Sequence, residues 1–199
     1  MFSGAYDFAT RPQDKAFIPG YRLDVAQRAW EISQLLKWYC EKKPIRVLEI
    51  GTYEGGTLYG WLQYAQPGAT IITIDLEEPR PFWQEWVRDD VELIHFVGDS
   101  HCEKIIQAVQ AKKPQIDFLF IDADHTYDGV KADFENYGKL VVSGGCIALH
   151  DIIDPHLNRH QEHIQVSHLW RKIRQAGYVT QELICHPGQG WGGIGVIYP

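Results

Sequence analysis

Two segments of the chain carry side chains that could bind a cation or remove a proton. Asp122 ends the run IDFLFID, and the pair His150 and Asp151 ends the run GCIALHD. If the two runs are neighbouring strands of a sheet, about 4.8 Å apart, these side chains converge at one edge. They would then bind a divalent cation. An all-oxygen site suits Mg²⁺, whereas the imidazole shifts the preference toward Mn²⁺, Fe²⁺ or Zn²⁺.

The same residues allow other interpretations. A hydroxyl is a weak nucleophile until it loses its proton, and a bound cation would lower its pKa. His150 could instead act alone as the general base, because the ordinary pKa of histidine is near 6.5. A third interpretation has no catalysis, with Asp122 and Asp151 capping helices and His150 bonded to backbone. The sequence leaves all three open.

A glycine-rich turn follows the apolar run at the start of VLEIGTYEGGT, residues 47–57. Gly51 and Gly56 fit the first and third glycines of a dinucleotide fingerprint, but Tyr53 stands at the middle position, where a glycine lets backbone approach a pyrophosphate. No Walker-type G-K-[ST] follows. The turn therefore favours a ligand without a pyrophosphate, and Asp75, which ends the next apolar run, is placed to bind a ribose.

The elements that must position these residues form an α/β pattern. Strand-like runs are separated by helix-length segments, which predicts a doubly wound, Rossmann-like, mostly parallel sheet with helices on both faces. The runs span residues 45–50, 69–75, 91–97, 116–122 and 145–151. A helix at 167–177 and two strands joined by the turn HPGQGWGG should follow, as an antiparallel pair at one edge. Ligands of such sheets bind beyond the carboxyl ends of the strands, where the strand order reverses. The acids above and Trp191 should therefore gather there.

The N-terminal segment is less regular. Residues 1–20 fit no period and are interpreted as an arm, followed by a helix from Arg22 to Cys40. The predicted organisation is an arm and leading helix over residues 1–44 and one globular unit over 45–199. The aromatic stretch FSGAYDF in the arm could dock on a second copy, which would make a homo-oligomer.

Composition excludes several partner classes. The 199 residues carry a net charge of -7 and no basic run, which predicts no nucleic acid partner. No apolar run approaches the roughly 18 residues that would suggest a membrane span. The four cysteines show no C-x-x-C spacing, and the N-terminus lacks the apolar core of a signal peptide. We expect a reduced, cytoplasmic protein that acts on a small molecule.

Several motifs in order carry a family resemblance. E-I-G-x-x-x-G-G and a following I-D are succeeded by HFVGDSHC, FLFIDADHTYDGVKADFENY, GGCIALHDI and WGGIGVIY. Over residues 45–199 this order resembles class I S-adenosylmethionine (SAM)-dependent methyltransferases, akin to catechol-type and macrolide-sugar O-methyltransferases and to a cephalosporin-hydroxylase-like family. The resemblance implies the seven-stranded methyltransferase fold, SAM as cofactor and methyl transfer to a hydroxyl oxygen of a small acceptor. The rivals are a metal-dependent hydroxylase or hydrolase on the same fold and a non-catalytic cofactor-binding subunit.

The resemblance also implies residue roles. Glu49 would lie near the methionine amino group, and Asp75 would bind the ribose hydroxyls. The expected cofactor contacts also include the turn and the adenine end, namely Gly51, Thr52, Tyr53, Gly55, Asp99, Ser100 and Asp122. Asp122 and His150 are the expected catalytic residues, and with Asp151 they are the expected metal ligands. His150-Asp151 stands where metal-dependent relatives carry Asp-Asn, Asp-Asp or Glu-Asp.

Two further segments invite a metal but have simpler interpretations. DHTYDGVKADFE, residues 124–135, matches the spacing of an EF-hand loop, yet it follows a buried strand and has Lys131 at position eight. A helix entered through Asp124 or Thr126 is expected instead. The segment after Asp151 carries four histidines and should overhang the substrate side as a solvated loop, although it could bind metal or sense pH. These histidines are His156, His160, His163 and His168.

Overall fold

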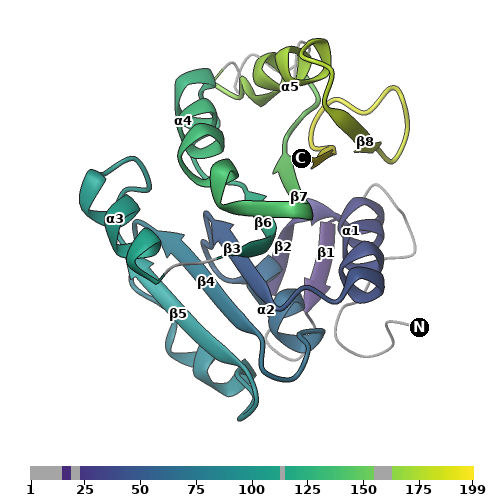
Figure 1. Ribbon diagram of the computed structural model, residues 1–199. Coiled ribbons are helices and arrows are strands. Elements are labelled where there is room, and N and C mark those ends of the chain that lie inside the picture. The colour runs from purple at the N-terminus through teal and green to yellow at the C-terminus, as the bar shows by residue number, and fades with distance from the viewer. Residues whose placement is uncertain (1–14, 19–22, 113–114, 155–162) are drawn as a thin grey trace.

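The computed structural model describes residues 15–18, 23–112, 115–154 and 163–199 (Figure 1). The first part of the chain forms β1 (Lys15–Ile18), β2 (Leu23–Arg28), α1 (Ala29–Lys42), β3 (Arg46–Ile50), α2 (Gly56–Gln63), β4 (Thr70–Asp75), the 3-10 helix η1 (Pro81–Trp86) and β5 (Glu92–Val97). The second part forms α3 (Glu103–Ala111), β6 (Ile116–Ile121), α4 (Tyr127–Tyr137), the 3-10 helix η2 (Gly138–Leu140), β7 (Val141–His150), α5 (Val166–Gln175), β8 (Val179–Leu183) and β9 (Ile194–Tyr198).

One seven-stranded sheet organises the molecule, in the order β5-β4-β3-β6-β7-β9-β8. All pairings are parallel except those of β9, which is antiparallel to both β7 and β8. The predicted fold class is confirmed, including the antiparallel pair at the C-terminal edge. The chain runs from β3 outward to β5 and then returns to β6 on the other side of β3. The strand order therefore reverses between β3 and β6.

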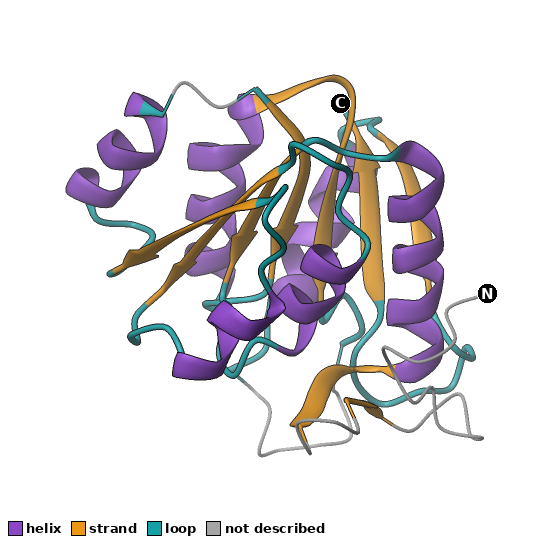
Figure 2. Cartoon of the chain, turned by 90° about the horizontal axis from the view of Figure 1, so that it is seen from below, coloured by secondary structure: helices purple, strands orange, loops and turns teal. Residues whose placement is uncertain are grey.

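Helices cover both faces of the sheet, as Figure 2 shows. Consecutive side chains of a strand point to opposite faces, and the buried residues follow this rule. Val47 packs in one core with side chains of α1, α2 and η1, among them Trp61. Its neighbour Leu48 packs in a second core with side chains of α3, α4 and α5, among them Trp170. Burial on both faces explains why the strands read as continuous apolar runs.

The leading helix begins later than the sequence predicted. The expected start at Arg22 is wrong, because residues 23–28 form β2, which pairs antiparallel with β1, and α1 begins at Ala29. Apolar residues of the segment happen to fall at helical spacing, but pairing with a partner strand decides the backbone. The other residues of the predicted arm lie outside the described part of the chain.

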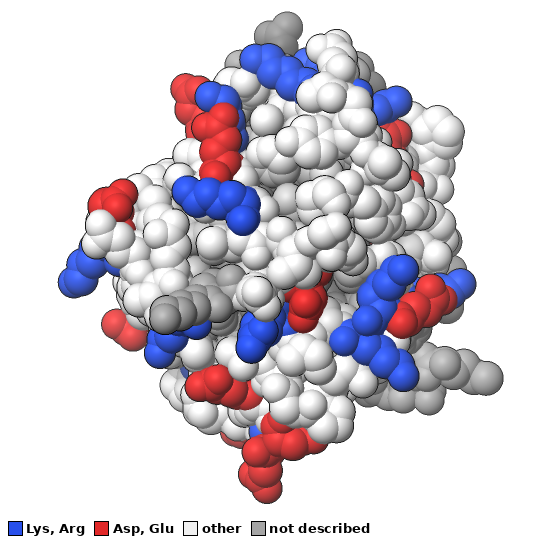
Figure 3. All heavy atoms as spheres, viewed as in Figure 1, with Lys and Arg blue, Asp and Glu red and all other residues white. Residues whose placement is uncertain are grey.

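Charged side chains are spread over the surface. On the face shown in Figure 3, basic and acidic residues are interspersed across a largely uncharged surface. Within the described ranges, the structure has no helix long and apolar enough to cross a membrane.

Candidate functional site

A cavity of about 980 Å³ opens at the carboxyl ends of β3, β4, β6 and β7. It contains the point where the strand order reverses, where sheets of this type bind their ligands. Its size is at the upper end of the roughly 300–1,000 Å³ of small-molecule sites. There is room for a cofactor and a small second molecule together.

The turn after β3 depends on its glycines. Gly51 has a φ of 85°, and a Cβ atom there would lie 2.0 Å from the carbonyl oxygen of Asp122 at the end of β6. Only glycine therefore allows β3 and β6 to end this close together. Tyr53 also lies in the left-handed region, with a φ of 50°, although it carries a side chain. Such backbone strain concentrates at functional sites.

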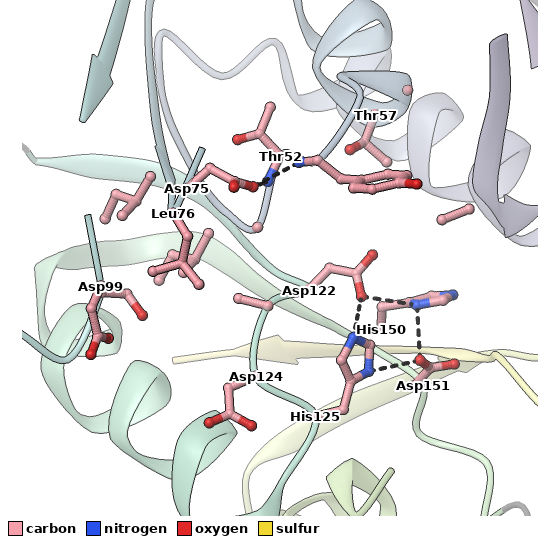
Figure 4. Close-up of a pocket in the computed structure, with 18 of the residues that line it drawn as sticks. Thr52, Thr57, Asp75, Leu76, Asp99, Asp122, Asp124, His125, His150 and Asp151 are labelled. Atoms are coloured by element: carbon pink, nitrogen blue, oxygen red, sulfur yellow. Dashed lines mark hydrogen bonds and ion pairs between the residues drawn. The ribbon is translucent and has the colours of Figure 1, made fainter. Parts of the chain in front are cut away.

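Asp75 closes one side of this turn. Its Oδ2 accepts hydrogen bonds from the backbone N–H of Thr52 and Tyr53, both at 2.7 Å (Figure 4). Its Oδ1 accepts one from the N–H of Glu77 at 3.0 Å. The acid that was predicted to bind a ribose thus also holds the glycine turn, and it lines the cavity.

Asp99 and Ser100, for which an adenine contact is predicted, lie in the cavity wall. The Oδ1 of Asp99 accepts the backbone N–H of His101 at 2.8 Å, and the carbonyl of Ser100 accepts the hydroxyl of Tyr137 at 2.7 Å. Behind them Asp133 is fully buried, 3.3 Å from Nε2 of His101. Burial raises the pKa of Asp133 to about 6.

Of the predicted cofactor residues, Glu49 and Gly55 are absent from the described cavity wall, and Gly55 lies against the indole of Trp83 instead. Glu49 points into the core. Its side chain is fully buried, and its Oε1 accepts hydrogen bonds from the hydroxyl of Thr57 at 2.5 Å and from the indole N–H of Trp61 at 2.8 Å. Burial raises its pKa to about 8. Thr57 lines the cavity, whereas the described wall does not include Glu49. The contact of Glu49 with a methionine amino group therefore stays a prediction.

The predicted cation ligands do come together, because β6 and β7 are neighbours. The Nδ1 of His150 lies 3.2 Å from Oδ1 of Asp122 and 3.5 Å from Oδ2 of Asp151. A fourth residue, His125, joins them, with Nδ1 2.9 Å from Oδ2 of Asp151 and Nε2 3.7 Å from Oδ1 of Asp122 (Figure 4).

His125 is a site residue that the sequence did not reveal. Asp122, His125 and Asp151 each offer a ligand atom within 4.8 Å of the others, a geometry that could hold a metal ion. The only sequence signal was that His125 follows Asp122 by three residues. Thr126 caps α4 by accepting the N–H of Gly129 at 3.1 Å, so the helix interpretation of the EF-hand match is confirmed and His125 lies in the turn before the helix.

The electrostatics of this cluster favour a positive charge beside its carboxylates. Burial alone would lower the pKa of His150, but the carboxylates of Asp151 and Asp122 outweigh it and raise that pKa to about 10. Burial opposes ionisation of Asp151, yet His150 and His125 hold its pKa at about 2. Without a cation the ring of His150 therefore keeps a proton beside the buried carboxylate of Asp151 and the partly buried carboxylate of Asp122. Asp151 also has a left-handed backbone, with a φ of 58°.

Trp191 lines the cavity, as expected for the C-terminal turn. The guanidinium of Arg28 lies 4.1 Å from the centre of its ring, and Nε of Arg28 donates to its carbonyl at 3.3 Å. Buried Glu31 in the first turn of α1 accepts the N–H of Gly193 at 2.9 Å. The start of α1 therefore fixes the position of this turn.

Only part of the histidine-rich loop lies within the described residues. His163 and His168 are exposed, and His168 lies on α5. His156 and His160 lie outside the described residues, so the predicted overhang of this loop stays a prediction.

A family model described as a methyltransferase domain matches residues 48–152, just over half of the chain. An uncharacterized protein of Acanthamoeba polyphaga mimivirus is 32% identical over an alignment of 121 residues, a match that covers 57% of this chain. The match spans 54% of that protein, so this chain corresponds to about half of its relative's length.

Solved structures share the fold at low identity. An O-methyltransferase from Bacillus cereus in complex with SAH has a TM-score of 0.66 at 19% identity, over 85% of this chain and 80% of its own. The O-methyltransferase TomG from Streptomyces achromogenes, in complex with SAM, has a TM-score of 0.68 at 19% identity, over 90% and 84% of the two chains. MycE, a methyltransferase of mycinamycin biosynthesis in complex with Mg and SAH, has a TM-score of 0.59 at 14% identity, over 83% of this chain and 48% of its own.

Proposed function

The chain belongs to the methyltransferase-domain family, and on this premise we propose that it transfers a methyl group from SAM to a hydroxyl oxygen of a small molecule with the help of a divalent cation. The observation that carries the cofactor assignment is the charge of the cavity. Five aspartates line it, and the described wall residues include no Lys or Arg. The aspartates are Asp75, Asp99, Asp122, Asp124 and Asp151. SAM bears a positive sulfonium and an ammonium group, which an acidic cavity attracts, whereas it would repel a pyrophosphate.

The end of the cavity beside Gly51 and Asp75, which we call the turn end, fits the rest of the cofactor. The backbone of the turn approaches the cavity closely because Gly51 has no side chain. Asp75 would accept the ribose hydroxyls, and Asp99 and Ser100 would border the adenine. Ile74 and Leu76 add apolar wall on either side of Asp75. Such a mixture of apolar surface and a few directed polar groups is typical of a cofactor site.

The donor set at the opposite end of the cavity, which we call the cation end, fits a divalent cation. Two carboxylates and one imidazole, from Asp122, Asp151 and His125, suit Mn²⁺, Fe²⁺ or Zn²⁺ better than an all-oxygen site would. Such an ion would lower the pKa of the acceptor hydroxyl. His150 contacts both carboxylates through Nδ1. This contact supports a role in holding the two acids, rather than the lone general base that the sequence left open.

The two ends are close enough to act on one pair of reactants. The backbone of Gly51 packs directly against that of Asp122, so the cofactor turn adjoins the cation cluster. An acceptor oxygen at Asp122 would therefore lie beside the methyl group, and holding both reactants in place lowers the entropic barrier to transfer. Trp191 supplies a flat wall on this side, which would orient the acceptor and exclude water.

Calorimetry tests the proposal. Metal-stripped protein should bind SAH, and added Mn²⁺ should bind as well, whereas NADH should not bind. Wild-type protein with Mn²⁺ should then transfer a radiolabelled methyl group from SAM to some member of a panel of hydroxylated small molecules. Failure to bind SAH with or without Mn²⁺ would overturn the proposal. Tight SAH binding without transfer to any acceptor would favour the non-catalytic subunit.

A further inference from the structure

Strand β2 reaches the cavity although it lies outside the segment that the family model matches. Its consecutive residues Ala26 and Gln27 both line the cavity. In a regular strand two consecutive side chains point to opposite faces. The pairing register of β1 with β2 shifts between Lys15 and Phe17, whose partners are Arg28 and Asp24. Such an irregularity changes the direction in which side chains point and often lies beside an active site.

Gln27 uses this position to bind one oxygen of Asp122. Its side chain is almost fully buried, at 2% exposure, and its Nε2 donates to Oδ2 of Asp122 at 2.5 Å, across 95 residues of sequence. An ionised carboxylate only accepts hydrogen bonds, so the amide nitrogen must face it. The amide oxygen, Oε1, is then left buried, with no hydrogen-bond partner in the described part of the chain.

An unpartnered buried amide oxygen destabilises the folded chain. A methionine of similar length would fill the same space without this cost. The presence of an amide at Gln27 is therefore explained by the hydrogen bond that its nitrogen donates to Asp122. That bond also separates the two oxygens of Asp122, because Oδ2 is occupied by Gln27 while Oδ1 faces His150 and His125.

We propose that Gln27 is a positioning residue that fixes the rotation of the Asp122 carboxylate, so that Oδ1 alone is presented to a divalent cation. The N-terminal strand β2 thus completes the cation site built by β6 and β7. This inference rests on the cation-assisted function proposed above. Partners that orient a metal ligand typically contribute 10–100-fold to metal affinity.

Gln27→Met separates this role from a merely structural one. The variant keeps the volume of the side chain, loses the donor and removes the unpartnered oxygen. We expect the affinity for Mn²⁺ to fall about 10–100-fold, with an unfolding temperature equal to or above that of the wild type. Gln27→Asn keeps the amide on a side chain one methylene shorter, so it should also lose affinity.

The test is calorimetric titration of Mn²⁺ into the metal-stripped full chain, with the unfolding temperature of each variant. Gln34→Met is the matched control, because Gln34 is half-buried on α1 outside the cavity and should keep wild-type affinity. Wild-type Mn²⁺ affinity in Gln27→Met, or in Gln27→Asn if the first variant does not fold, overturns the inference and leaves the proposed function intact. The inference is also overturned if the affinity for Mn²⁺ falls only in those variants whose unfolding temperature falls as well. A wild-type chain that binds SAH but no Mn²⁺ removes the cation and the inference together.

Discussion

The two ends of the cavity are built in different ways. At the turn end, the carboxylate of Asp75 is bound by three backbone N–H groups from the ends of neighbouring segments. At the cation end, Asp122 and Asp151 are held mainly by the side chains of His125, His150 and Gln27, which come from separate segments of the chain, and a single backbone N–H, that of Gly192, also bonds to Asp151. There Nε2 of His150 is buried without a hydrogen-bond partner among the described residues. The carboxylate of the turn end is thus satisfied by backbone before a ligand binds, whereas the carboxylates of the cation end depend on a positive charge beside them.

If the ends are independent in this sense, removing one charge at the cation end should leave the turn end unchanged. Asp151→Asn keeps the shape of the side chain, and asparagine tolerates the left-handed backbone of this position. Because an anionic ligand is lost, the affinity for Mn²⁺ should fall by more than about 100-fold, beyond the loss typical of outer-shell partners. Calorimetry should show SAH affinity within about twofold of wild type in the absence of metal, well under 1 kcal/mol.

Asp154→Asn, three residues along the chain, is a matched control. Its carboxylate lies 3.6 Å from the exposed guanidinium of Arg171 rather than in the cluster. It should bind Mn²⁺ as the wild type does. If Asp151→Asn also binds Mn²⁺ normally, the cation site lies elsewhere and the contrast between the two ends disappears.

Gly51 is the position where the two ends should fail together. Gly51→Ala places a Cβ atom against the carbonyl of Asp122 in a left-handed backbone, so strain and overpacking should total about 3 kcal/mol. The unfolding temperature should fall by about 6–12 °C, and affinities for both SAH and Mn²⁺ should weaken. Differential scanning calorimetry and the two titrations measure this.

Gly68→Ala provides the comparison, because Gly68 has a similar φ of 79° but nothing within 4 Å of the added atom. Only the strain of about 1–2 kcal/mol remains there, and ligand affinities should not change. Equal losses in the two alanine variants would show that the contact between β3 and β6 does not join the two ends.

Asp75→Ala should affect the turn end alone. The substitution removes the acceptor for the N–H groups of Thr52 and Tyr53 and the predicted ribose contact. Hydrogen bonds to charged groups contribute about 1.5–3 kcal/mol, so SAH affinity should fall about 10–100-fold, with Mn²⁺ affinity unchanged. Glu77→Ala is the control, since its side chain is 59% exposed and pairs with Arg80. A weaker affinity for Mn²⁺ in Asp75→Ala would contradict the independence of the ends.

The contrast also explains which parts the sequence could predict. The strands and the turn end are encoded locally, since an apolar run, an acid at its end and a glycine turn lie within a few residues. Gly51 and Asp75 were therefore recognisable, as was the antiparallel edge formed by β8 and β9. Asp122 and Asp151 were also predictable as neighbours, because each ends a strand of the same parallel sheet.

What the sequence could not show depends on contacts between distant segments. Gln27 reaches Asp122 across 95 residues, from a segment whose apolar spacing resembled a helix. His125 lies in a turn whose direction is set by the start of α4. Glu49 has the type and position of a ligand-binding acid, but packing against Trp61 turns its carboxylate into the core. Local pattern gives the strand ends, while side-chain direction requires the packed structure.

Glu49 gives the smallest and most discriminating effect. Its pKa is raised to about 8, so its neutral form stabilises the fold at low pH, and this contribution is lost as pH rises from the ordinary value near 4.3 through 8. Glu49→Gln keeps an oxygen for Thr57 and Trp61 but does not ionise. Between pH 7 and 8.5 the wild type should therefore lose about 1 kcal/mol relative to the variant, or roughly 2–4 °C in unfolding temperature. Repeating the scans with saturating SAH then locates the carboxylate. If Glu49 stays behind Thr57, the pH dependence of the difference is unchanged, whereas direct contact with the ligand's ammonium group would lower the pKa of Glu49 and flatten it. The second result would place Glu49 in the turn end, which would then also contain a carboxyl group that gains a positively charged partner only when the ligand binds.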